Sequence, residues 1–173
     1  MIDLRDYIRD VPDFPRKGIL FKDITPVLAD AGAFASAVEL MSRRFPRPGG
    51  LVAIESRGFV FGAALALQWR VPLVLARKFG KLPGRTVRQV YSLEYGEDTL
   101  ELHADALAPG QQVLVVDDLL ATGGTALAAA RLVEQLEARV VGTVFLVELV
   151  GLGGRQRLQG YPVEALLQYE VRE

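Results

Sequence analysis

Apolar residues along the chain occur either in short continuous runs or at helical spacing. The continuous runs predict strands. They cover residues 51–54, 72–76, 112–116 and 138–149, and a final strand is expected at 163–170. Apolar residues at i, i+3, i+4 and i+7 predict helices. This spacing covers residues 34–45, 60–67 (Val60, Ala63, Ala64 and Leu67) and 129–136, and shorter helices are expected at 3–10 and 153–158.

Other segments lack a helical period. Residues 11–26 are punctuated by prolines and a glycine, and they predict an extended loop. Residues 77–90 show no apolar period and predict a second loop. Residues 89–95 and 99–103 alternate in polarity, which predicts an antiparallel hairpin with its turn at 96–98.

The order of these elements predicts an α/β fold. Strands that alternate with helices indicate a mostly parallel central sheet flanked by helices on both faces, with the antiparallel hairpin inserted after the 77–90 loop. The length of 173 residues fits a single domain over 1–173. We expect about residues 1–30 and part of the C-terminus to form a small hood over the sheet edge.

Composition removes several functional classes. The formal net charge is -1, which indicates no nucleic-acid partner. No apolar run reaches the roughly 18 residues of a membrane helix, and the charged N-terminus is no signal peptide. The chain lacks cysteine, which suits a reducing cytosol and excludes disulfides. His103 is the single histidine, which argues against a Ser-His-Asp triad and a histidine metal site.

The stretch VLVVDDLLATGGT (113–125) carries the strongest candidate chemistry. Ligands bind beyond the carboxyl ends of strands in open parallel sheets, and Asp117 and Asp118 follow the 112–116 strand directly. The small turn before the next helix offers backbone N–H groups, hydroxyls and the helix dipole to an anion. It consists of Ala121, Thr122, Gly123, Gly124 and Thr125. This pattern predicts a phosphate in the turn and a hydroxyl-rich group or a metal at the carboxylates. A Walker A loop is excluded, because no Gly-Lys-Ser/Thr is present. An acidic Mg²⁺ pocket, as in receiver domains, is the alternative for the aspartates alone.

Two further segments could bind anions. Glu55, Ser56 and Arg57 lie between the 51–54 strand and a helix, where backbone N–H groups and the Arg57 guanidinium can meet a second anion. A surface arginine in a turn is the alternative. The 77–90 loop contains five cations and no acidic residue, so it can be a mobile lid that closes on a polyphosphate or a solvated basic loop. Its cations are Arg77, Lys78, Lys81, Arg85 and Arg88.

The 113–125 stretch resembles the motif with which type I phosphoribosyltransferases bind 5-phosphoribosyl 1-diphosphate (PRPP). Stretches 13–28, 53–62, 77–84 and 91–96 extend the resemblance over most of the chain, to the adenine-specific members of that family. One departure is Pro15-Arg16-Lys17-Gly18, where the family has Pro-x-Pro-Gly. The missing proline lowers the stiffness of the loop and removes no chemical group.

The resemblance implies a role for each candidate. Asp117 and Asp118 would hold the ribose hydroxyls, and residues 121–125 the 5′-phosphate. Residues 55–57 would bind the diphosphate, which Arg57, Lys78 and Lys81 would neutralise as it leaves. Arg77 would reach the partner's site in a homodimer, and Glu94 would assist proton transfer. Adenine would lie between the hood and the last central strand. The residues implied there are Leu20, Phe21, Lys22 and Leu149, with Glu148 as a weaker candidate.

The implied reaction is purine salvage in the cytoplasm, in which adenine and PRPP give AMP and diphosphate. The transition state would have oxocarbenium character, and Mg²⁺ would bind mainly through the substrate, with Asp117 and Asp118 as candidate direct ligands. Two alternatives stay open: transfer to another base, or a PRPP-binding regulator on the same fold. Such a regulator would keep 116–125 but also need an effector domain, for which the sequence before residue 50 has no room.

Overall fold

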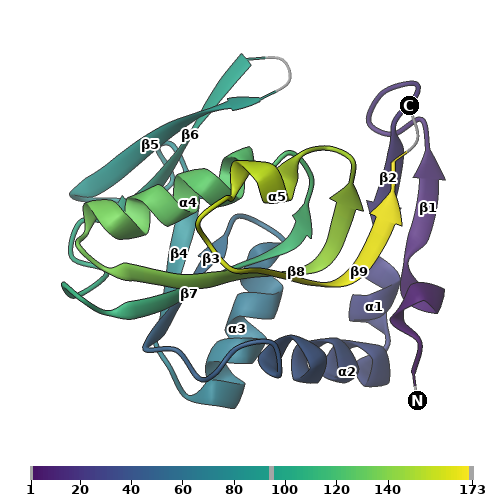
Figure 1. The fold of residues 1–173 in the computed structure, drawn as a ribbon, viewed down its shortest axis with the longest axis horizontal. Helices are drawn as coiled ribbons and strands as arrows, with labels where there is room; N and C mark the ends of the chain where they lie inside the picture. The colour runs from purple at the N-terminus through teal and green to yellow at the C-terminus, as the bar shows by residue number, and fades with distance from the viewer. Residues whose placement is uncertain (1, 94–95, 172–173) are drawn as a thin grey trace. The chain divides into compact units, whose positions relative to one another are not determined.

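The computed structural model describes residues 2–93 and 96–171 (Figure 1). The chain divides into two compact units, residues 1–40 and 41–173. None of the helices within the described residues has the length and apolar character needed to span a membrane.

The N-terminal unit contains a two-stranded antiparallel sheet. Strands β1 (Arg9–Pro12) and β2 (Leu20–Asp23) pair in the register Val11↔Phe21. The 3₁₀-helix η1 (Leu4–Tyr7) precedes them, and α1 (Thr25–Ala29) and α2 (Ala31–Ser42) follow. The predicted helix over 3–10 is therefore wrong beyond Tyr7, and the predicted loop over 11–26 contains β2 and the start of α1. Pairing between two short segments satisfies their backbone groups, and this pairing leaves no periodic signal in either segment.

The second unit is built on a seven-stranded sheet in the order β5-β6-β4-β3-β7-β8-β9. Pairing is parallel throughout β4-β3-β7-β8-β9 and antiparallel for β4-β6 and β5-β6, which confirms the predicted fold class. The strands are β3 (Gly50–Ile54), β4 (Leu73–Lys78), β5 (Thr86–Leu93), β6 (Gly96–His103), β7 (Gln112–Leu120), β8 (Arg139–Val150) and β9 (Val163–Glu170). Every residue of β3 is buried, as expected for a parallel strand covered on both faces.

Helices cover both faces of this sheet. Helix α3 (Gly58–Trp69) lies on one face, and α4 (Gly124–Gln135) and α5 (Gly154–Arg157) lie on the other (Figure 1). The apolar stripe that marks α3 in the sequence is its outer side, since Leu67 is 80% exposed and Val60 39% exposed. The opposite side, which includes Phe61 and Gly62, is buried. A helix that is apolar all round gives no periodicity that could distinguish its two sides.

Three boundaries differ from the prediction near the carboxyl ends of the strands. Strand β7 continues to Leu120, so Asp117 and Asp118 lie within it rather than after it. Strand β5 begins at Thr86, inside the predicted 77–90 loop. Residues 96–98 belong to β6, with Asp98 opposite Tyr91, so the predicted turn position is wrong. These strands extend past the residues that show the apolar pattern. Backbone hydrogen bonds between strands require a neighbouring backbone and do not require apolar side chains.

Candidate active site

The carboxyl ends of β3 and β7 meet because the two strands are parallel neighbours, with Ala53 opposite Val116. A cavity of about 440 Å³ opens there. Its lining includes seven residues predicted from the sequence, namely Glu55, Ser56, Arg57, Lys78, Asp117, Asp118 and Thr125. The other lining residues, which sequence reasoning missed in this role, are Tyr91, Asp98 and Leu119. The cavity can therefore present carboxylates and cations to one ligand.

The paired aspartates have different surroundings. Asp118 is 3% exposed, and its Oδ2 lies 2.9 Å from Arg57 Nε but has no hydrogen-bond partner of suitable geometry among residues 2–93 and 96–171. Asp117 Oδ1 accepts a hydrogen bond from the Asp118 N–H at 2.8 Å. Burial raises the pKa of both carboxyls, and the neighbouring Asp118 charge raises that of Asp117 further. This unmet acceptor capacity suits a ligand that brings hydroxyl donors.

The pKa of Asp117 predicts a pH-dependent stability. An acid whose pKa is raised above its ordinary value of 3.8 stabilises the fold at low pH, and this contribution is lost as pH rises through the raised pKa. We therefore expect Asp117→Asn to raise Tm at pH 7 by about 2–4 °C, the shift that roughly 1 kcal/mol produces in a chain of this size. The gain should vanish near pH 4. Thermal melts between pH 4 and pH 8 measure it, and parallel Tm-against-pH curves for the two proteins would contradict it.

Glu55, which follows β3, pairs with the Arg77 side chain and with the backbone of Lys78. Its carboxylate accepts hydrogen bonds from Arg77 Nη2 at 3.2 Å, Arg77 Nε at 3.3 Å and the Lys78 N–H at 2.8 Å. Burial by itself raises the pKa of Glu55, but these donors outweigh it and lower the pKa overall. The Glu55–Ser56 peptide bond is cis, and Arg57 follows as the N-cap residue of α3. Arg77 is thus bound to Glu55 of its own chain, and its role at a partner's site stays a prediction.

The 121–125 turn lines a second, smaller cavity of about 180 Å³ at the start of α4. No side chain caps this helix, whose N-cap Gly123 has a φ of 78°, so its first N–H groups are available to an anion. Gly154 of α5 packs directly against the turn. A Cβ at Gly154 would lie 2.4 Å from the Ala121 carbonyl oxygen, and a Cβ at Gly123 would lie 2.8 Å from the Gly154 carbonyl oxygen. The Gly153-Gly154 pair was the only sequence signal for this support.

Lys78 is held by a carboxylate that the sequence did not reveal. Lys78 Nζ lies 2.9 Å from Asp98 Oδ2, and the Tyr91 hydroxyl donates to the same oxygen at 3.2 Å. The hydrogen bond to Asp98 raises the pKa of Lys78. Burial raises the pKa of Asp98, but the hydrogen bonds from Lys78, the Thr99 N–H and Tyr91, together with the charge of Lys78, outweigh it and lower the pKa overall. Lys81 does not line the 440 Å³ cavity, and its carbonyl oxygen accepts a hydrogen bond from Arg77 Nη1 at 3.2 Å.

One buried carboxylate fixes both ends of the basic loop, which is shortened to residues 79–85. Glu101 is 1% exposed, and it accepts hydrogen bonds from the Gly80 N–H at 2.9 Å and the Thr86 hydroxyl at 3.1 Å. Arg88 Nε lies 2.8 Å from the same carboxylate, and its guanidinium stacks over the Phe79 ring at 4.7 Å. Arg88 is therefore a strand residue in an ion pair, which corrects its assignment to the loop.

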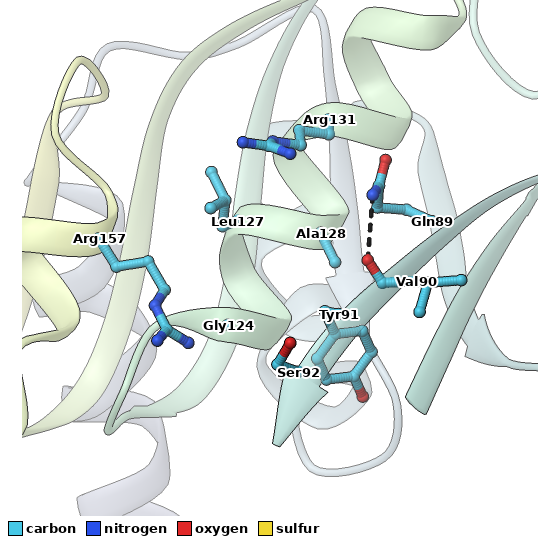
Figure 2. A pocket seen from close by; sticks show the side chains of 9 residues that line it. All are labelled: Gln89, Val90, Tyr91, Ser92, Gly124, Leu127, Ala128, Arg131 and Arg157. Atoms are coloured by element: carbon cyan, nitrogen blue, oxygen red, sulfur yellow. Dashed lines mark hydrogen bonds between the residues drawn. The ribbon is translucent and has the colours of Figure 1, made fainter. Parts of the chain in front are cut away.

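Tyr91 separates the 440 Å³ cavity from a neighbouring one. This neighbouring cavity, of about 250 Å³, lies between β5 and α4, with Arg131 and Arg157 among its lining residues (Figure 2). Figure 2 shows the Tyr91 hydroxyl pointing away from both arginines, and this hydroxyl is the group that reaches Asp98. Tyr91 is 8% exposed, so the packing around its ring holds the hydroxyl in place.

The predicted base-binding residues belong to different units. Leu20, Phe21 and Lys22 form most of β2, where Leu20 is 49% exposed and the Phe21 ring lies 5.1 Å from that of Phe14. Leu149 lies near the end of β8. Glu148 beside it is 4% exposed and accepts hydrogen bonds from Arg155 Nε at 2.8 and 2.9 Å. Glu148 is thus already paired. Glu94 lies outside the described residues.

Known proteins resemble the chain over nearly its whole length. Residues 30–164 match the model of the phosphoribosyl transferase domain. The adenine phosphoribosyltransferase of Natranaerobius thermophilus is 50% identical over 171 residues, which cover 98% of this chain and 100% of that protein. The adenine phosphoribosyltransferase of Anaeromyxobacter sp. is 56% identical over 168 residues, covering 96% of this chain and 95% of that protein.

Solved structures agree in fold. The adenine phosphoribosyltransferase of Thermoanaerobacter pseudethanolicus aligns with a TM-score of 0.93 at 49% identity, covering 96% of this chain and 98% of that one. The Saccharomyces cerevisiae enzyme, complexed with an imino-altritol bisphosphate and adenine, aligns with a TM-score of 0.89 at 42% identity, covering 95% and 96%. On this evidence the chain belongs to the phosphoribosyltransferase family and, within it, to the adenine phosphoribosyltransferases.

Proposed function

We propose that the chain transfers the 5-phosphoribosyl group of PRPP to N9 of adenine and releases AMP and diphosphate, a reaction of purine salvage. The observation that carries the proposal is the paired carboxylates of Asp117 and Asp118 between two anion-binding segments, 55–57 and 121–125, in adjoining cavities. The identity of the base is supported by the relatives at 50% identity or more and by adenine in the yeast complex. A chain without cysteine suits the cytoplasm.

The reaction requires positioning and charge stabilisation rather than a covalent nucleophile. The bond from ribose C1 to the diphosphate oxygen breaks with oxocarbenium character, and adenine N9 bonds to C1 and loses its proton. Asp117 and Asp118 hold the ribose hydroxyls while the 121–125 turn holds the 5′-phosphate. Arg57 and Lys78, with Lys81 from the basic loop, neutralise the departing diphosphate. Glu94 is the proposed acceptor of the N9 proton.

The carboxylates of the cavity fit Mg²⁺ that arrives with the substrate. Oxygen ligands are those that Mg²⁺ prefers, and the ion commonly combines one or two carboxylates with substrate phosphates and water. Within residues 2–93 and 96–171 there is no cluster of three or more metal-ligating side chains. Mg²⁺ would therefore be held mainly through the substrate, and Asp117 and Asp118 are the protein residues that would hold it. When bound, the ion would offset negative charge on the leaving group.

The outer side of α3 supports the proposed homodimer. Val60 and Leu67 expose apolar side chains on this helix, and a helix that is apolar on both sides normally packs on both. Arg77 is the residue that we assign to the partner's site. In the described chain it binds Glu55, a contact that it would exchange on assembly.

A steady-state assay of diphosphate release tests the proposed function. PRPP is supplied with adenine, hypoxanthine, guanine, xanthine or orotate in turn. Release that depends on adenine, with AMP as the second product, supports the proposal. A preference for another base would make that base the substrate in place of adenine. PRPP binding without diphosphate release in the presence of any base would indicate a regulator.

Phe21 is the aromatic residue that we assign to the adenine ring. We expect Phe21→Ala to raise the KM for adenine about tenfold, because one lost apolar contact to a substrate costs roughly 1–3 kcal/mol. The KM for PRPP should stay within about twofold, since no phosphate group depends on this ring. Initial rates with each substrate varied in turn measure both constants. Equal increases in the KM for adenine and the KM for PRPP would show that Phe21 is not part of the base site.

A further inference from the structure

Carboxylates that line the 440 Å³ cavity form ion pairs with three cations, of which Arg57 and Lys78 also line the cavity and Arg77 does not. Arg57 is paired with Asp118, Arg77 with Glu55 and Lys78 with Asp98. The proposed reaction uses Asp118 and Glu55 at the substrate. Among the described carboxylates that line the cavity, Asp98 is the one to which the reaction assigns no task.

The pairing of the hairpin explains why Asp98 faces Lys78. Asp98 is the register partner of Tyr91, and Leu100, two residues later on the same face of β6, is the partner of Lys78. Leu100 and Leu102 on this face are 1% and 0% exposed. Asp98 thus extends a core-facing row of β6, and its carboxylate lies between side chains of β4 and β5 at the cavity.

We propose that Asp98 is a positioning residue that holds the Lys78 ammonium before substrate binds, yields it to the diphosphate group, and takes it back as diphosphate leaves. The inference rests on the proposed function, which assigns Lys78 to the diphosphate. Asp98 itself touches no reacting atom and acts through Lys78.

The strength of the pair suits an exchange of partners. The Lys78 side chain is 55% exposed and that of Asp98 is 22% exposed, so water screens the 2.9 Å contact. Partly exposed pairs of this kind contribute little to stability, so either partner can be exchanged at small cost. A diphosphate carries several negative charges and can therefore displace a single carboxylate. Tyr91 keeps its hydroxyl on Asp98, so the carboxylate stays in place to receive Lys78 again.

The charge of Asp98 also favours release of the product. Its carboxylate stays within reach after Lys78 has moved to the diphosphate, and it competes with the diphosphate for the ammonium because opposite charges attract. Asp98 should therefore weaken the binding of diphosphate and speed its departure. If Asp98 only supported the fold, substituting it would weaken diphosphate binding, because a disordered site binds diphosphate less tightly.

The test is Asp98→Asn, with titration calorimetry of inorganic diphosphate in the presence of Mg²⁺. We expect the affinity to rise roughly fivefold, the equivalent of about 1 kcal/mol. In steady state the KM for PRPP and kcat should both fall, because diphosphate leaves more slowly. Asp98→Ser removes the same charge and gives a second variant, and Asp98→Glu should stay within twofold of the native chain. Glu97→Gln changes the same charge at an exposed position of β6 and is the matched control, with no change expected.

A Lys78→Met background separates action through Lys78 from the general charge effect. There Asp98→Asn should change the diphosphate affinity less than twofold, and a full fivefold gain in that background would overturn the inference. Weaker diphosphate binding by Asp98→Asn and Asp98→Ser, or a lower kcat with unchanged KM, would overturn it as well. If the native chain itself neither binds diphosphate nor releases it from PRPP, the proposed function fails instead.

Discussion

Asp118→Asn is expected to lower kcat on the order of 10²-fold while the protein stays folded. Hydrogen bonds to charged groups contribute roughly 1.5–3 kcal/mol, and the substitution removes the charge that we propose meets the ribose hydroxyls and the developing positive charge on the ring. Stability should not fall, because burial raises the pKa of Asp118 and so already disfavours its charged form in the folded chain. Initial rates with adenine and PRPP, together with a thermal melt, measure both effects.

The matched control for this variant is Asp105→Asn, which makes the same chemical change at an exposed turn residue. It should leave kcat and Tm unchanged. If Asp118→Asn unfolded the chain, or kept full specific activity when folded, then Asp118 would be a structural residue. The ion pair with Arg57 would in that case be its role, and the ribose would need another partner.

Gly154→Ala is expected to raise the KM for PRPP about tenfold or more and to lower Tm by roughly 5 °C. A Cβ at this position would lie 2.4 Å from the Ala121 carbonyl oxygen and 2.8 Å from Leu120 Cγ. The 121–125 turn, which we propose receives the 5′-phosphate, would have to shift, and forced shifts of packed backbone cost roughly 1–3 kcal/mol, or about 2–4 °C per kcal/mol in a chain of this size. Rates at varied PRPP and a thermal melt measure the two effects.

Gln156→Ala is the control for Gly154, because it truncates an exposed side chain of the same short helix. It should change neither the KM for PRPP nor Tm. A stability loss in Gly154→Ala with an unchanged KM for PRPP would show that α5 supports the fold without shaping the phosphate turn.

Much of the site could be predicted from the sequence because its residues directly follow short, strongly apolar runs. In a parallel sheet the carboxyl ends of neighbouring strands lie together, so Glu55 to Arg57 and Asp117 with Asp118 had to share one edge once the order of strands and helices was known. The turn at 121–125 followed from small residues placed before a helix. These inferences require only local spacing and the general rules of parallel sheets.

Other features left no local signal. Tyr91 and Asp98 come together only through the antiparallel register of β5 and β6, and the alternation of side chains placed the turn of that hairpin wrongly. Glu101 looks like any strand glutamate until the basic loop folds over it and three donors reach its carboxylate. Gly154 is far from the phosphate turn in the chain, and only the packing of α5 brings it there.

The sequence by itself determined the fold class, the family resemblance and the residue types at the two segments that we propose bind anions. It could do so because backbone propensity, apolar period and motif spacing are properties of neighbouring residues. Only the tertiary structure decided which cation meets which carboxylate: Arg57 with Asp118, Arg77 with Glu55 and Lys78 with Asp98. These pairings join different strands and loops, so they depend on strand register and on burial, which arise only once distant segments of the chain have packed.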